Sequence, residues 1–144
     1  MVKKIVYGVL TLIVFGASFF YWLISSIAPE GGIKDYTQTE PADLVYLEQT
    51  VSEQRGKILA VVTSVAKMGD TDKSTGYELT ELSRAYYVFQ ANGFEVDIAS
   101  PQGGEPPVVI DDGDMGPFDY AFLNDEVAQN KVVNSVPLAN VNPE

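Results

Sequence analysis

The sequence of 144 residues contains no cysteine and no histidine. Without cysteine the chain forms no disulfide and no thiolate metal site, and it has no thiol nucleophile. Without histidine it lacks the commonest general base and the commonest metal ligand of proteins. Thr63 and Ser64 therefore have no imidazole partner for a hydrolase triad. These absences exclude the usual nucleophilic enzymes for this chain acting alone, and we expect no metal and no cofactor.

Basic residues are also scarce, with 9 Lys and Arg against 20 Asp and Glu and a net charge of −11. Lys3 and Lys4 precede an apolar segment, so the remainder holds 9 − 2 = 7 basic and 20 acidic groups, a net of −13. Such a field repels phosphates, and we expect no nucleic-acid partner. A partner recognised by charge is therefore cationic, unless the acidity serves only to keep the domain soluble.

One long hydrophobic run is present: residues 5–27 are 23 consecutive residues without a charge. As a helix this run spans about 34 Å, slightly more than the hydrocarbon core of a bilayer. Tyr7 lies near one end and Trp22 near the other, where aromatic rings favour the headgroup level. The pattern predicts a transmembrane anchor over residues 1–28, through which the protein contacts the membrane.

Lys3 and Lys4 place the N-terminus in the cytoplasm by the positive-inside rule. We therefore expect a single-pass protein of a bacterial inner membrane whose soluble part faces the periplasm. The alternative is a signal peptide cleaved after Ala28, since residues 26–28 read small-x-small. The length of the apolar run and the presence of Pro29 just after that bond favour the anchor.

Residues 29–56 read as a tether followed by a short amphipathic helix. Residues 29–40 show no apolar period, whereas Pro41 suits a first helical position and Gly56 a position just past a helix end. Leu44, Leu47 and Val51 lie at helical spacing and share one face of the expected helix. That face packs either on the following domain or on lipid.

Residues 57–144 have the pattern of an α/β domain. Residues 58–62 form an aliphatic run typical of a strand buried on both faces of a parallel sheet. Thr75 and Glu78 form a capping-box pattern that opens a helix, and Gly93 ends it. Residues 94–98 then alternate as a second strand with a narrower apolar side. Strand, helix and strand at this spacing predict a right-handed crossover with parallel pairing.

A long acidic loop follows over residues 101–117, and it includes Asp111, Asp112 and Asp114. An EF-hand template that starts at Asp112 places Leu123 where the bidentate glutamate belongs, so that template fails. A solvated acidic turn is the plainer interpretation, and a different divalent-ion loop stays open. Residues 118–133 then regain helical spacing.

Several segments carry a family resemblance: Thr-Gly-Tyr-Glu-Leu-Thr-Glu-Leu at 75–82, Tyr-Tyr-Val-Phe at 86–89, Ala-Asn-Gly-Phe-Glu-Val-Asp-Ile-Ala-Ser-Pro at 91–101, and Phe-Leu-Asn-Asp at 122–125. Together they are similar to the glyoxalase III-like branch of the ThiJ/PfpI superfamily, which is class I glutamine amidotransferase-like. The resemblance implies the N-terminal βαβ portion of a flavodoxin-like, three-layer α/β sandwich. It also implies an enzyme, often a homodimer, that acts on 2-oxoaldehydes such as methylglyoxal, or on their adducts, without an organic cofactor.

In that family an acidic residue stands twelve positions before the glycine that ends the first helix, which is Glu81 before Gly93 here. The resemblance implies that Glu81 is a largely buried catalytic carboxyl that hydrogen-bonds a cysteine nucleophile. The family's Gly-Gly-x-Gly strand end and its Cys-His pair would lie beyond Glu144. On helical geometry alone, Glu81 is a surface residue that pairs with Arg84 at i,i+3.

We therefore expect the N-terminal portion of a membrane-anchored ThiJ/PfpI-like protein, cut short by a frameshift, a split gene or an incomplete gene model. The complete form would be of glyoxalase III, deglycase or hydrolase type, and this chain alone would be inactive. Its partners would be a second copy or a complementary C-terminal half, with an aldehyde substrate only once completed. The alternative is a non-catalytic, membrane-anchored envelope binding module. We also expect residues 57–144 alone to fold loosely, because Val61, Val62 and Ile98 lack cover.

Overall fold

The structure, a computed structural model, describes residues 2–27 and 34–142. The chain divides into two compact units, Met1–Asp35 and Tyr36–Glu144. Ala28, the last residue of the expected anchor, and residues 29–33, the first part of the expected tether, lie outside the described residues.

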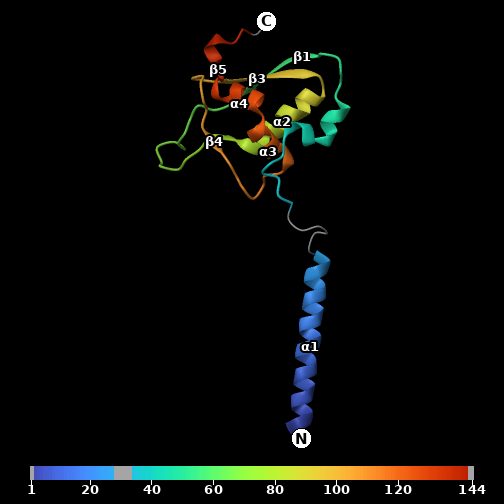
Figure 1. The fold of residues 1–144 in the computed structure, drawn as a ribbon. Coiled ribbons are helices and arrows are strands. Elements are labelled where there is room, and N and C mark those ends of the chain that lie inside the picture. The colour runs from blue at the N-terminus through green and yellow to red at the C-terminus, as the bar shows by residue number, and fades with distance from the viewer. Residues whose placement is uncertain (1, 28–33, 143–144) are drawn as a thin grey trace. The chain divides into compact units, whose positions relative to one another are not determined.

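The N-terminal unit contains one helix, α1, which runs over Val2–Ile27 (Figure 1). Its segment Val6–Ile27 is long and apolar enough to cross a membrane. The hydroxyls of Thr11 and Ser26 donate to backbone carbonyls one turn earlier, so these polar groups are satisfied within the helix. The helix therefore has the features of a membrane span or a signal sequence.

The second unit is a mixed α/β structure, as the sequence predicts. Three parallel strands form one sheet in the order β1-β3-β5, with β1 at Gly56–Val61, β3 at Phe94–Ser100 and β5 at Val136–Pro137. Helix α2, Leu79–Ala91, connects β1 to β3. The predicted crossover with parallel pairing is thus confirmed.

Helices α2, α3 (Pro117–Asn124) and α4 (Glu126–Val133) lie on one side of the three-stranded sheet (Figure 1). The sequence predicts a single helix over residues 118–133, but the structure has two. Asp125 separates them because its extended backbone ends α3. Its side chain then accepts hydrogen bonds from the amides of Val127 (2.9 Å) and Ala128 (3.1 Å) at the start of α4.

Three aromatic side chains form the centre of the core. Tyr86 and Tyr87 of α2 and Phe122 of α3 are all fully buried. Tyr86 packs edge-on against both of the others, at 5.4 Å from Tyr87 and 5.2 Å from Phe122 between ring centroids. The smaller buried apolar residues around them are Leu44, Val62, Leu79, Leu82, Val96, Ile98, Ala121, Ala128 and Val132.

The prediction that the first strand is buried on both faces is wrong. Leu59 and Val61 of β1 are 37% and 55% exposed, because the three helices cover only the opposite face of the sheet. The second strand, β3, is the more buried one since it lies between β1 and β5. Of the three residues expected to lack cover, Val62 and Ile98 are buried and only Val61 is exposed.

The expected amphipathic helix after the tether consists of two short 3₁₀ turns, η1 at Pro41–Asp43 and η2 at Val45–Gln49. Leu44 interrupts them with an extended backbone (ψ 92°). Its side chain is 4% exposed and belongs to the core of the domain. The apolar face therefore packs on the domain rather than on lipid, and burial of Leu44 is favoured over a continuous α-helix.

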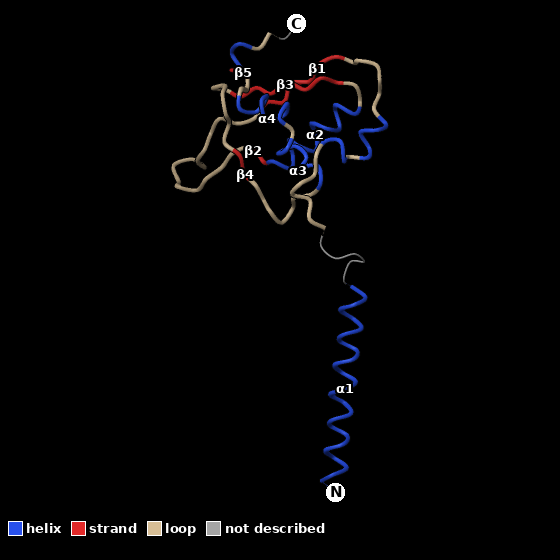
Figure 2. The backbone as a smooth tube through the Cα atoms, in the orientation of Figure 1, coloured by secondary structure: helices blue, strands red, loops and turns tan. Residues whose placement is uncertain are grey.

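A second, two-stranded sheet lies in the loops beside the helices (Figure 2). In it β2 (Tyr77–Glu78) pairs in parallel with β4 (Val108–Val109). The long acidic loop thus crosses the start of α2. A last 3₁₀ turn, η3, covers Leu138–Asn140.

Candidate functional site

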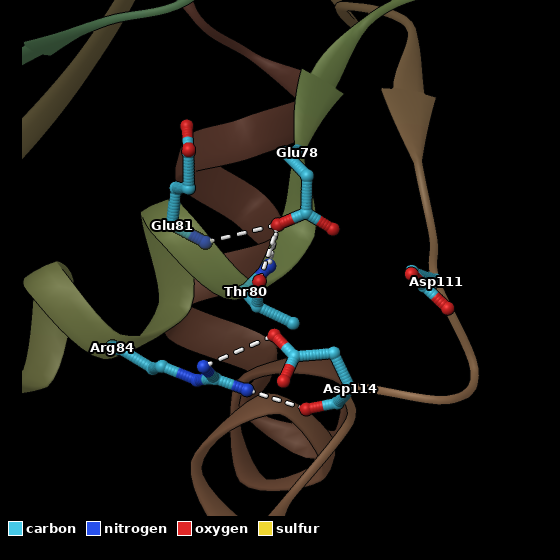
Figure 3. A pocket seen from close by; sticks show the side chains of 6 residues that line it. All are labelled: Glu78, Thr80, Glu81, Arg84, Asp111 and Asp114. Atoms are coloured by element: carbon cyan, nitrogen blue, oxygen red, sulfur yellow. Dashed lines mark hydrogen bonds and ion pairs between the residues drawn. The ribbon is translucent and has the colours of Figure 1, made fainter.

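The candidate site lies at the start of α2, where Glu78 caps the helix (Figure 3). One of its carboxylate oxygens accepts hydrogen bonds from the amides of Thr80 (2.8 Å) and Glu81 (3.2 Å), and from the Thr80 hydroxyl. The prediction that Thr75 opens this helix is wrong. Tyr77 and Glu78 are held extended by pairing with β4, so the first helical residue is Leu79.

Glu81 lies in the first turn of α2 and is exposed. Its carboxylate points away from Arg84 and Asp114 in Figure 3. The predicted i,i+3 pair with Arg84 is wrong, because Arg84 makes its ion pairs with Asp114 and Asp119 instead. Within residues 2–27 and 34–142 the Glu81 carboxylate has no hydrogen bond and no ion pair. The family resemblance implies a buried carboxyl, whereas nothing in the described chain covers this one.

An open cavity of about 430 Å³ lies between the end of β1 and the start of α2. Its lining residues are Ala60, Val61, Val62, Thr63, Gly76, Tyr77, Glu78, Glu81, Leu82 and Ala85. In sheets of parallel strands, ligands bind at the carboxyl ends of the strands, and this cavity is at that end of β1. Burial raises the pKa of Tyr77, and the nearby Glu105 adds to the rise.

A second open cavity, of about 550 Å³, lies between the start of α2 and the acidic loop. Glu78 and Glu81 line it too, together with Thr80, Arg84, Asp111 and Asp114 (Figure 3). The Arg84 guanidinium holds the acidic loop in place, with 3.2 Å between its Nη1 and Asp114 Oδ2. The hydrogen bond to Asp119 is the main cause of the raised pKa of Arg84. The two cavities therefore share two carboxylates.

Asp119 supports this arrangement from inside the domain. It is fully buried and accepts hydrogen bonds from the Ser83 hydroxyl, from the Gly116 amide (2.8 Å) and from Arg84 (3.0 Å). Sequence analysis did not single out Asp119 or Ser83. The sequence does contain a signal for this helix start. Gly116, Pro117 and an acidic residue at the third helical position, Asp119, form a pattern that marks the start of a helix.

The acidic loop uses its carboxylates for its own conformation. Asp111 accepts a hydrogen bond from the Gly113 amide (3.0 Å), and Asp114 pairs with Arg84. Over the described residues there is no group of three or more acidic, histidine or cysteine side chains placed to hold a metal ion.

No family model matches the sequence, and no curated protein matches it. A solved structure, that of the Rapid Encystment Protein 24 kDa (REP24) of Francisella tularensis, is similar to this chain with 34% sequence identity and a TM-score of 0.53. The similarity covers 60% of this chain and 39% of REP24. The chain thus corresponds to well under half the length of that protein.

Proposed function

We propose that residues 57–144 are the N-terminal portion of a membrane-anchored ThiJ/PfpI-like protein with a flavodoxin-like, three-layer sandwich. The complete form acts on 2-oxoaldehydes or their adducts, with a cysteine nucleophile that this chain does not supply. Glu81 is the carboxyl partner of that nucleophile. The observation that carries the proposal is the position of Glu81, whose carboxylate has no partner in the described chain and lines a cavity at the carboxyl end of β1.

One feature of the architecture supports this proposal, and another states what the proposal still requires. The β1-α2-β3 crossover has the parallel pairing that a flavodoxin-like sheet requires. Its helices cover one face of the sheet, so a three-layer sandwich needs further elements on the face that carries Leu59 and Val61. Elements of this kind come from a second copy, a complementary C-terminal half or a longer form of the chain.

The chemistry of a thiol site explains why Glu81 would matter once such elements are present. A carboxyl beside a cysteine holds or passes on its proton, and the thiolate then attacks the aldehyde carbon. The 144-residue chain contains neither thiol nor imidazole. We therefore expect the purified chain to convert no methylglyoxal, and glutathione-independent lactate production by it would contradict this expectation.

The decisive experiment reads the DNA beyond codon 144 in all forward frames and expresses any extended product. An aliphatic strand, Gly-Gly-x-Gly and Cys-His in one frame, followed by lactate formation from methylglyoxal, would support the enzyme. In that product Glu81→Gln should lower kcat by at least about a hundredfold. Glu126→Gln is the matched control, since Glu126 is also an exposed glutamate in a first helical turn. Equal loss in both variants would contradict the role of Glu81.

We also propose that α1 stays in the inner membrane and that the α/β unit faces the periplasm. The segment Val6–Ile27 is of sufficient length and lacks charge, and Lys3 and Lys4 lie in the first turn of α1, before this segment. Protease added to sealed spheroplasts should remove the α/β unit. Protection until lysis would reverse the topology, and a shortened mature chain starting after Ala28 would identify a signal peptide.

A second function, a non-catalytic envelope binding module, is favoured by a separate observation. β1 pairs only with β3 in the described chain, so one of its edges is open, and Leu59 and Val61 are exposed beside that edge. Exposed apolar edge strands are templates for pairing with another chain. This function needs no thiol.

A further inference from the structure

Within residues 2–27 and 34–142, the backbone of β1 has a row of hydrogen-bonding groups without partners. The amide of Val62 donates to Ala99 of β3 (2.9 Å), and peptide directions alternate along a strand. The amides and carbonyls of Leu59 and Val61 therefore point to the opposite edge. No described strand pairs with that edge. These groups have the spacing that hydrogen bonds to an added strand require.

Sheet edges are normally protected against such pairing by charges, prolines or bulges. On β1 the only charge is Lys57 at its beginning, which pairs with Glu95 (3.2 Å) and Asp97 (3.4 Å) of β3. The second half of the strand has no charged residue and no proline. This half of the edge is therefore open to another strand.

The cavity beside this edge has room for the side chains of such a strand. Its volume is about 430 Å³, and apolar lining comes from Val62 of the sheet region and from Leu82 and Ala85 of α2. Side chains of a strand alternate between the two faces of a sheet. Where an added strand runs beside residues 60–63, its side chains on the helix-covered face would thus point toward the cavity, and the alternate side chains would lie on the face that carries Leu59 and Val61.

The charge of the cavity lining determines which side chains of an added strand are complementary to it. Glu78 and Glu81 line the cavity, and no basic residue is among its lining residues. The second carboxylate oxygen of Glu78 is buried and has no hydrogen-bond partner in the described chain. Glu81 has no ion pair there either. A side chain that enters this end of the cavity is therefore complementary when it is cationic.

We propose that the open edge of β1 binds an extended segment of another polypeptide, with apolar side chains in the cavity and one lysine or arginine that pairs with Glu81. The segment adds as a strand beside β1 and provides partners for the backbone groups of Leu59 and Val61. This inference rests on the second function proposed above, the binding module, and is independent of the thiol chemistry. A second acidic copy of this chain is disfavoured as the occupant by the net charge of −11.

The test uses the full chain in lipid nanodiscs and a labelled synthetic peptide that alternates valine and threonine, with lysine in place of its central valine. Fluorescence anisotropy should show saturable binding. Leu59→Pro removes an amide on the open edge without touching the ladder with β3, and it should abolish binding. Leu59→Ala keeps the amide and is the matched control. If Leu59→Pro binds the peptide as tightly as Leu59→Ala, strand addition is wrong.

A charge exchange tests the contact with Glu81 and does not rely on a proline variant. Glu81→Lys should weaken binding of the lysine peptide by about fivefold or more, and a peptide with glutamate in that position should recover it. Glu126→Lys should leave both peptides unaffected. No recovery, or equal effects of the two variants, would overturn the proposed pairing. A dimer in sedimentation experiments that Leu59→Pro dissolves would assign the edge to a second copy and overturn the proposal.

Failure of the peptide-binding proposal is distinguishable from failure of the enzyme proposal. Peptide binding is measured on the 144-residue chain, whereas the enzyme proposal is judged on the extended product and its lactate formation. Activity of that product with no peptide binding here would reject only the inference on β1.

Discussion

The guanidinium of Arg84 and the carboxylate of Asp119 lie 3.0 Å apart, although 35 residues separate them in the chain. Asp119 is fully buried, whereas 43% of the Arg84 side chain is exposed. The pair joins α2 to the start of α3, and through Asp114 it also fixes the acidic loop. The position of the candidate site therefore depends on a contact between distant segments.

Replacement of Asp119 by alanine should strongly destabilise the domain. It removes the carboxylate to which the Ser83 hydroxyl and the Gly116 amide donate, and it removes the buried ion-pair partner of Arg84. We expect a loss of about 2–4 kcal/mol in the free energy of unfolding, measured by urea denaturation. Asp114→Ala is the control and should cost less than about 1 kcal/mol, because this carboxylate is mostly exposed. Similar losses in both variants would contradict the structural role of Asp119.

Replacement of Glu78 by alanine removes the cap of α2. We expect a loss of about 1 kcal/mol, because the amides of Thr80 and Glu81 lose their acceptor. Glu48→Ala, at an exposed position in η2, should change stability by less than about 0.5 kcal/mol. Thermal unfolding followed by circular dichroism is a suitable measurement. An unchanged midpoint for Glu78→Ala would show that the cap does not stabilise the helix.

Alkaline pH should destabilise the domain through its buried tyrosines. Burial raises the pKa of Tyr86 to about 12; Asp125 adds to the rise and Gln90 opposes it. Burial also raises the pKa of Tyr87, again with a contribution from Asp125. Above about pH 10 the unfolded chain loses these protons first, so stability is full below pH 10 and falls above it. Each tyrosine contributes a slope of up to about 1.4 kcal/mol per pH unit, measurable by urea denaturation at stepped pH.

The two tyrosines should respond differently to replacement by phenylalanine. The Tyr87 hydroxyl donates to Asp125 (3.2 Å), so Tyr87→Phe should cost about 1 kcal/mol at pH 7. The buried Tyr86 hydroxyl makes no hydrogen bond of normal geometry with the described residues. Tyr86→Phe should therefore be neutral or stabilising at pH 7 and should reduce the alkaline slope. A larger loss for Tyr86→Phe than for Tyr87→Phe would contradict this assignment.

Replacement of Gly93 by alanine should disrupt the connection between α2 and β3. Gly93 has φ +81°, and a Cβ there would lie 2.3 Å from the carbonyl oxygen of Glu53. We expect a loss of about 2–4 kcal/mol in unfolding free energy. Gly104→Ala separates strain from clash, since Gly104 has φ +70° but open space around it, and should cost about 1 kcal/mol. Equal costs would show that no clash occurs at Gly93.

Local sequence patterns determined much of this protein. The uncharged run over residues 5–27 specifies α1, because a helix of that length and composition needs no tertiary partner to form in an apolar environment. The spacing of apolar residues also predicts α2 and its two flanking strands, and Gly93 predicts the end of the helix. These features depend on neighbours within a few residues, and such neighbours are visible in the sequence.

Tertiary structure decided the remaining features, because they depend on contacts between distant residues. Thr75 has good capping chemistry, but pairing of β2 with β4 holds Tyr77 and Glu78 extended and moves the cap to Glu78. The aliphatic composition of β1 suits a buried strand, yet its burial depends on whether other elements cover it. The spacing along α2 predicts Glu81 as the partner of Arg84, but the buried Asp119, 35 residues away, binds Arg84 instead. Residue spacing along one helix cannot show whether Glu81 or Asp119 pairs with Arg84. The energy of an ion pair depends on burial and on additional hydrogen bonds, and only the folded chain provides these.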